Sequence, residues 1–536
     1  MVIVQKYISG VFMNKIFYSS LSLITVILLT GCGSSDLTQE KNKNISMQHQ
    51  DYREPQKPTP IGGEHVSDNI QKVKSLRALN TTEVNDIRAK GLVYLNTLRQ
   101  KAGMITYNAE SHLDTAAYNH AHYLMINNAG GHGESSGNPG YTGASPSERV
   151  VYAGYLHRMV SENLSSGNSS VYDSIDGLFS AIYHRFGFLS FSMNEIGIGA
   201  DTSESHPHGN AYNYDMGVSQ LRVLCEGESY SGSGAYYYGV CADSQFKIEQ
   251  SQYDNAMSEN KMNNPKYVLW PYENQPDSRP VFFEEDPDPL PECSVSGYPV
   301  SVQFNKAKSG EVAVQSFKLY YDANGTEITN TKLLDKDTDP NSRFSAYEYA
   351  LYPMKRLDWD TKYHVVVSYT EDNTPKNIDW TFKTKALPYP YYKIVQKDST
   401  FNIKSGQTYL LYLPPENCND GGAGYSMSYS GGLTIESDFY DYNTIQIKVT
   451  GSSGSVNISP RNGRDFTLIV AQNDSAIYPS TDEKVNKKAY SDFNGDGISD
   501  IFWRNGVANS LWLMHKDGSH QWVPQVDKAK SFQPYL

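Results

Sequence analysis

The chain has 536 residues, of which 39% are hydrophobic and 20% are charged, a balance typical of globular proteins. Its formal net charge is −13 at pH 7 and no basic patch is visible, which argues against nucleic acid as a partner. The length exceeds that of one ordinary domain and predicts a multidomain protein.

Residues 1–31 have the pattern of a lipoprotein signal peptide. An apolar run covers residues 16–29 and is short for a transmembrane helix. It ends in Leu-Thr-Gly-Cys32, which resembles the bacterial lipobox, in which the cysteine is lipidated. Gly33 follows, so the Asp that signals inner-membrane retention is absent. We expect export and a lipid anchor on Cys32, at the outer membrane or cell surface of a bacterium; the alternative is an ordinary buried cysteine after an apolar helix.

The next segments alternate between polar and amphipathic sequence. Residues 32–80 are rich in Lys, Gln, Asn, Ser and Pro and are predicted to form a flexible tether. Apolar residues spaced by threes and fours then predict a helix that begins near Thr81 and ends at Gly103. Two further helices are predicted over residues 109–127 and 170–186.

The character of the sequence changes from about residue 266. Residues 269–292 carry prolines and acidic residues at a density typical of a linker. Alternating apolar runs then predict β-strands. They place an Ig-like β-sandwich in residues 266–387, with strands at 300–304, 363–369 and 380–384. A second β domain is predicted in residues 388–478, with strands at 408–413, 445–449 and 466–470.

Six short motifs follow one another in the helical part of the chain. They are Asn96-x-x-Arg99, Ala117-x-x-His120-x-x-Tyr123, Gly131-His132-x-Glu134, Ser161-Glu162-Asn163, Tyr183-His184-Arg185 and Glu195-Ile-Gly-Ile-Gly199. In this order they resemble the bacterial branch of the CAP superfamily, named for cysteine-rich secretory proteins, antigen 5 and pathogenesis-related 1 proteins. The resemblance implies an α-β-α sandwich with a cleft in residues 81–265.

The cleft of that family is lined by two histidines and usually two acidic residues, which can hold a divalent metal. By resemblance, His132 and His184 are the two histidines, with Tyr183 in place of the usual glycine before His184, and Glu162 is one acid. The second acid does not map cleanly. Its candidates are Glu134, Asp173 and Asp176.

The residue types also have a chemical meaning of their own. Two imidazoles with one or two carboxylates are suited to Zn²⁺, although another divalent metal would also be possible, and an open position on the metal would activate a bound water. His184 and Arg185 lie in the otherwise apolar run AIYHRFGFL. We expect His184 to face the cleft, with a buried and satisfied histidine as the alternative, and Arg185 to make a structural hydrogen bond or ion pair.

Two further signals concern disulfides and calcium. Cys225 and Cys241 bracket a Gly/Ser/Tyr-rich segment and are predicted to pair in an exported protein, whereas the pairing of Cys293 and Cys418 stays open. A loop of the form D-x-N-x-D-G-x-x-D could surround Ca²⁺ with oxygens. Its predicted ligands are Asp492, Asn494, Asp496, Ile498 and Asp500. With the apolar runs after it, the loop resembles a single FG-GAP or VCBS-type repeat in residues 487–536.

Three functions are compatible with these features. The favoured one is a lipid-anchored surface protein whose CAP-like cleft binds an unknown small molecule, lipid or envelope component. The second is a metal-dependent hydrolase or protease in which His132, Glu162 and His184 hold or activate a water. The third is a structural, adhesin-like module with a vestigial cleft.

Overall fold

The computed structural model describes residues 77–420 and 424–470 with their side chains, and beyond these only the backbone of Ala471 and of five strands. These strands are β1 (Lys15–Ile16), β2 (Ile61–Gly62), β27 (Ile501–Asn505), β28 (Ala508–Met514) and β29 (His520–Pro524). Cys32 and the predicted calcium ligands from Asp492 to Asp500 therefore lie outside the described residues.

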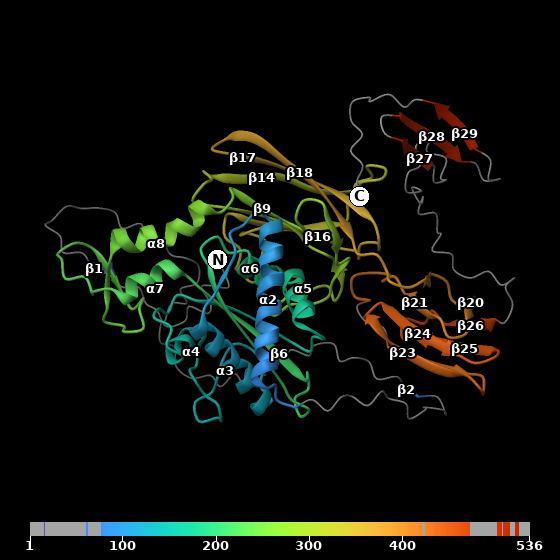
Figure 1. Ribbon diagram of the computed structural model, residues 1–536, viewed down its shortest axis with the longest axis horizontal. Helices are drawn as coiled ribbons and strands as arrows, with labels where there is room; N and C mark the ends of the chain where they lie inside the picture. Colours follow the sequence, from blue (N-terminus) through green and yellow to red (C-terminus); the bar gives the residue numbers. More distant parts are fainter. Residues whose placement is uncertain are drawn as a thin grey trace. The chain divides into compact units, whose positions relative to one another are not determined.

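The chain divides into two compact units, shown in Figure 1. Unit 1 comprises Met1–Pro58, His65–Leu387 and Pro414–Gly422, and unit 2 comprises Thr59–Glu64, Pro388–Leu413 and Ala423–Leu536. Within the described residues, none of the helices is long and apolar enough to cross a membrane.

The first long helix of unit 1, α2 (Thr81–Lys101), has well-defined ends. Asn80 caps it, because its side chain accepts from the amide of Glu83 while the Glu83 carboxylate accepts from the amide of Asn80. The predicted start near Thr81 is therefore one residue after the cap. The helix stops before Gly103, whose φ of +77° lies in the left-handed region that favours glycine.

A four-stranded sheet at the centre of this part has the order β3-β5-β6-β4. Its strands are β3 (Asn108–Ala109), β4 (Ser161–Ser166), β5 (Glu195–Thr202) and β6 (Asn210–Gly217). Two glycines of β5 admit helix α3 (Ser111–Asn127), because a Cβ on Gly197 or Gly199 would lie 1.9 Å or 2.1 Å from backbone atoms of that helix.

The opposite face of β5 carries larger side chains. Ile196 and Ile198 pack in one core with residues of α2 and α5 (Val171–Ser180), since side chains alternate between the two faces of a strand. Helices thus cover both faces of this sheet, as the resemblance predicts (Figure 1). Helix α4 (Pro146–Tyr152) packs beside α3.

The third predicted helix is in fact two helices. Helix α5 ends at Ser180, Ala181 has an extended backbone with φ −79° and ψ 115°, and α6 (Ile182–Phe188) begins directly after it. The prediction of one helix over residues 170–186 missed this break. The break matters because it sets the direction of α6, which carries His184 and Arg185.

The remaining part of the helical region holds a disulfide between Cys225 and Cys241. Its elements are α7 (Ser219–Glu226), β7 (Tyr236–Tyr238), β8 (Lys247–Glu249) and α8 (Gln250–Asn263), with β7 paired to both β8 and β1.

Two four-stranded sheets complete unit 1, with the orders β10-β18-β17-β14 and β15-β16-β13-β9. Their strands, with a small β11-β12 pair beside them, are β9 (Tyr267–Trp270), β10 (Gln275–Ser278), β11 (Val281–Phe282), β12 (Ser296–Gly297), β13 (Val300–Phe304), β14 (Val312–Tyr321), β15 (Thr331–Leu334), β16 (Glu348–Pro353), β17 (Lys362–Glu371) and β18 (Thr374–Thr384). Buried residues of both sheets share one core with the helical region.

The segment that composition marks as a linker is part of this structure. Strands β9, β10 and β11 all overlap it, and Trp270 stacks on Phe179 of α5 with ring centroids 4.2 Å apart. A second disulfide joins Cys293 to Cys418, which also belongs to unit 1. The helical region and the first β region are therefore one packed body.

Unit 2 contains two sheets with the orders β19-β21-β24-β23 and β2-β22-β25-β26-β20. Their strands other than β2 are β19 (Tyr391–Lys393), β20 (Ser399–Lys404), β21 (Thr408–Tyr412), β22 (Tyr425–Tyr429), β23 (Thr434–Asp441), β24 (Thr444–Thr450), β25 (Gly454–Pro460) and β26 (Phe466–Ala471). Ile445, Ile447 and Val449 of β24 lie in the unit's own apolar core. A separate antiparallel sheet, β27-β28-β29, includes the two runs that the sequence predicts to follow the calcium loop.

Candidate functional site

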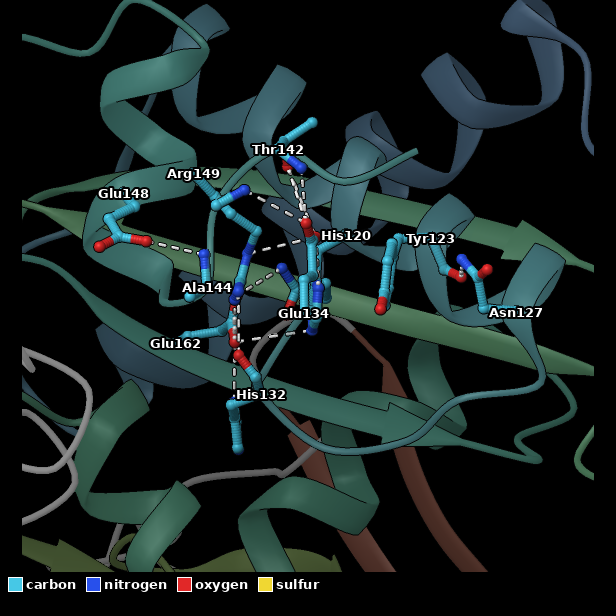
Figure 2. A network of polar contacts seen from close by, with 12 residues as sticks. His120, Tyr123, Asn127, His132, Glu134, Thr142, Ala144, Glu148, Arg149 and Glu162 are labelled. Carbon is cyan, nitrogen blue, oxygen red and sulfur yellow. Dashed lines mark hydrogen bonds and ion pairs between the residues drawn. The ribbon is translucent and has the colours of Figure 1, made fainter. Parts of the chain in front are cut away.

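Glu162 is at the centre of a buried polar network on the first half of β4 (Figure 2). Arg149 of α4 donates from Nη2 to both carboxylate oxygens of Glu162, at 2.8 and 2.6 Å. Asn213 of β6 donates to Oε2 at 3.0 Å. Burial by itself would raise the pKa of Glu162, but Arg149 and the two nearby histidines outweigh it and hold the pKa well below its usual range. Glu162 is therefore a carboxylate at neutral pH.

His132 follows the Gly130-Gly131 turn and pairs with this carboxylate. Its Nδ1 lies 2.8 Å from Glu162 Oε1. Burial lowers the pKa of His132 and outweighs the opposing effect of Glu162, so the ring is neutral at pH 7. A neutral ring that faces a carboxylate with Nδ1 carries its proton there, which leaves the lone pair on Nε2.

A second buried pair supports the first. His120 of α3 directs Nδ1 to Glu134 Oε1 at 3.0 Å and Nε2 to the carbonyl of Gly131 at 3.1 Å. Glu134 also accepts from the amide of Thr142 at 2.7 Å, as Figure 2 shows. Glu134 thus fixes the loop that carries His132 through its contacts with His120 and Thr142. Nothing in the spacing of the sequence separates this role from that of an acid in the cleft.

The second histidine, His184 on α6, pairs with a residue that the sequence did not indicate. Its Nδ1 lies 2.7 Å from Oε1 of Glu285, which is 4% exposed and comes from the segment predicted as a linker. The same oxygen accepts from the backbone amides of Tyr183 at 2.9 Å and of His184 at 3.1 Å. Glu285 thus contacts His184 Nδ1 as Glu162 contacts His132 Nδ1. Its signal in the sequence, one glutamate in an acidic and proline-rich run, is too common to identify it.

The two imidazoles face one another. The ring centroids of His132 and His184 are 6.5 Å apart with 21° between the ring planes, and their side chains are 14% and 11% exposed. Each ring is oriented by a carboxylate that is fully buried. The arrangement presents two partly accessible imidazoles on a fixed frame, which can accept hydrogen bonds or bind a cation.

Asp215 adds a further acid behind Glu162. The two residues are direct partners across the β4-β6 pair, and Asp215 is fully buried. Among the described residues neither carboxyl oxygen of Asp215 has a hydrogen-bond donor. Burial, and then the charge of Glu162, raise the pKa of Asp215 well above its usual range. Asp215 therefore keeps its proton to a higher pH than a free aspartate does.

Two residues that were candidates for the second acid lie elsewhere. Asp173 binds Arg279 at 2.6 Å, and Asp176 accepts from the hydroxyl of Tyr94 at 2.7 Å. Both belong to α5, which the break at Ala181 separates from α6, so their turns do not continue to His184. Arg185, as expected, makes structural hydrogen bonds, to carbonyl groups and to Ser301.

The fit of this site to Zn²⁺ is incomplete. Among the described residues, no group of three or more His, Cys, Asp and Glu side chains is placed to hold a metal ion. Glu162 and Oε1 of Glu285 are engaged by Nδ1 atoms, backbone amides and Arg149, whereas Oε2 of Glu285 has no hydrogen-bond partner among the described residues. Structural and catalytic zinc sites use at least three protein ligands, and these side chains by themselves fall short of that number.

Comparison with known proteins agrees with this fold. Residues 92–214 match the model of the cysteine-rich secretory protein family, CAP, and these residues hold the CAP domain that the motifs predict. No curated protein matches the chain.

Solved structures give two similar bacterial chains. One is an extracellular protein containing a SCP domain from Bacillus anthracis, at 14% identity and a TM-score of 0.22, over 26% of this chain and 43% of that one. The other is an outer surface protein from Borrelia burgdorferi, at 17% identity and a TM-score of 0.22, over 26% of this chain and 97% of that one. The present chain thus spans less than half of the Bacillus protein's length.

Proposed function

We propose that this protein is an exported, lipid-anchored bacterial surface protein that binds a ligand between His132 and His184. The anchor is Cys32, and the ligand is an envelope component, such as a lipid, with hydrogen-bond donors. The single observation that supports this best is the pair of imidazoles, 6.5 Å apart and each held by a buried carboxylate.

The two buried His–Glu pairs support a binding role, because keeping their carboxylates buried costs free energy of folding. Glu162 and Glu285 are fully buried carboxylates, and burying a carboxylate is unfavourable unless donors compensate it. The donors to these two carboxylates include Nδ1 of both histidines, and these contacts fix the orientation of the two rings. In His132, whose ring is neutral, Nε2 is then the hydrogen-bond acceptor of the ring. A vestigial cleft would not need two such pairs.

Binding is tested with the full chain and a total lipid extract of a bacterial envelope. We expect native mass spectrometry to show a retained lipid on the wild type, and at least tenfold less on the double variant His132→Ala/His184→Ala. His112→Ala is a matched control, because its side chain is 50% exposed and lies on the same domain. Equal lipid on the wild type and the double variant would contradict binding at this site.

Two further arms test the rest of the proposal. Elemental analysis of the same proteins after dialysis against zinc tests metal binding. If the imidazoles bind a metal whose remaining ligands are water or a bound molecule, stoichiometric metal should be found in the wild type and not in the double variant. Labelling of cells with a fatty-acid analogue should mark the wild type but not Cys32→Ser, and a label that persists in the variant would contradict the anchor.

A further inference from the structure

A second candidate site is a cavity within unit 1, and none of His132, Glu162, His184 or Glu285 lines it. Its volume is about 230 Å³. The walls come from α2, α5 and the β9-β10 region, so the cavity exists only because the β region packs on the helices. Asp176, one of the three residues that the sequence offered as candidates for the second acid, lines this cavity.

The inner wall of the cavity is aromatic. Phe179 and Trp270 stack at 4.2 Å, and the indole N–H of Trp270 donates to the hydroxyl of Tyr298 at 2.8 Å. The polar edge of Trp270 is thus satisfied inside the protein. Tyr94 and Tyr272 line the outer part and are half-buried. Phe179 and Trp270 are only 1% and 2% exposed, so the rings that offer a ligand an accessible surface are those of Tyr94 and Tyr272.

The remaining walls carry balanced charges. Asp176 and Asp277 contribute two carboxylates, and Lys101 and Arg279 contribute two cations. Asp176 is held by the hydroxyl of Tyr94 at 2.7 Å, and Arg279 is held by Asp173, which lies one turn before Asp176 on α5. Asp277 and Lys101 are exposed at the rim. The lining therefore has hydrogen-bond donors and acceptors but no excess of either charge.

We propose that this cavity binds one neutral sugar ring, either as a free monosaccharide or as the terminal residue of a glycan. The C–H face of such a ring packs on aromatic side chains, and its hydroxyls donate to carboxylates and accept from Arg and Lys. A cationic ligand would require an excess of carboxylates, and a phosphate would require an excess of cations. An apolar ligand would leave the polar lining groups unpaired, which costs affinity. The volume is below the range typical of drug-sized ligands and suits a single ring.

The test uses the full chain and saturation-transfer NMR with named probes. The neutral probes are glucose, galactose, N-acetylglucosamine and fucose, and choline is the charged probe. We expect at least one sugar to bind with a Kd on the order of 1 mM, the range expected for a ligand of this size. Tyr272→Ala and Asp277→Asn should each weaken it tenfold or more. Because Asp277 is exposed, Asp277→Asn should stay folded, and it tests the proposal even if Tyr272→Ala fails to fold.

Matched controls separate this site from the others. Tyr389→Ala and Asp337→Asn change exposed residues of the same types outside the cavity and should bind the sugar as the wild type does. His132→Ala/His184→Ala should also bind it normally, so this inference can fail or succeed independently of the proposed lipid site.

The source of the ring is decided with a trisaccharide that ends in the sugar that binds. Equal affinity for the trisaccharide and the free sugar assigns the cavity to a glycan terminus, whereas loss of affinity assigns it to a free monosaccharide. The proposal is overturned if no sugar binds, if only choline binds, or if sugar binding survives both Tyr272→Ala and Asp277→Asn.

Discussion

Removal of the Glu285 carboxylate should loosen helix α6 at its first turn. Oε1 of Glu285 accepts from the amide of Tyr183 at 2.9 Å, the amide of His184 at 3.1 Å and Nδ1 of His184 at 2.7 Å. Glu285→Ala leaves all three buried donors without this acceptor, and each unsatisfied donor costs about 1–3 kcal/mol.

The measurable consequence is faster hydrogen exchange at residues 183 and 184. If the free energy of local opening falls by about 2 kcal/mol, exchange of these amides accelerates about 30-fold. Glu285→Gln keeps a carbonyl oxygen in place and loses only the charge, which is worth about 1 kcal/mol and about fivefold in exchange. The expected order of exchange rates is therefore Ala above Gln above wild type.

Hydrogen–deuterium exchange with mass spectrometry on peptides that cover residues 182–189 gives the readout. The matched control is Glu284→Gln, because Glu284 is the adjacent glutamate and is exposed. Wild-type exchange in Glu285→Ala, or equal acceleration in Glu284→Gln, would refute the assignment of Glu285 as the acid that positions His184.

Three further predictions concern stability. Gly199→Ala should destabilise unit 1 by about 3 kcal/mol or more in a thermal melt, because the new Cβ would lie 2.1 Å from the α3 backbone, whereas Gly133→Ala meets nothing closer than 4.0 Å and should be tolerated. Burial lowers the pKa of His157 to about 3, so on acidification the unfolded state takes up a proton before the folded state does. Stability should therefore fall as pH drops from about 6.5 to 3, and it should fall less steeply in His157→Gln. Urea unfolding across this pH range measures both. The pKa of Asp215 is raised, so stability should fall as pH rises above the pKa of a free aspartate. Asp215→Asn should therefore raise the urea midpoint at pH 7 more than at pH 4, and an equal change at both would contradict the raised pKa.

Much of the local structure could be predicted from the sequence, because its determinants are local. Apolar spacing by threes and fours located α2 and α3, and alternation located β13, β17, β24 and β26 to within a few residues, whereas only the second half of β18 was predicted. The break at Ala181 was missed, because the apolar pattern continues across it and only the backbone of one residue interrupts the helix.

The candidate site, too, could be predicted only in part from the sequence. The resemblance of the motifs to the CAP family indicated His132, Glu162 and His184, and in the structure the ring centroids of the two histidines are 6.5 Å apart. The fourth residue could not be found from spacing, since Glu285 is 101 residues from His184 and meets it only when the β region packs on α6. Composition marked its segment as a linker, because proline and acidic residues are common in linkers.

The sequence by itself determined helices α2 and α3, several of the strands and the chemical types available for a site. Only the tertiary structure decided which carboxylate serves which partner: Glu134 fixes a loop through His120, Asp176 lines a separate cavity, and Glu285 orients His184. The physical reason is that a buried charge is stable only next to its donors, and those donors come from elements far apart in the chain that meet when the core forms.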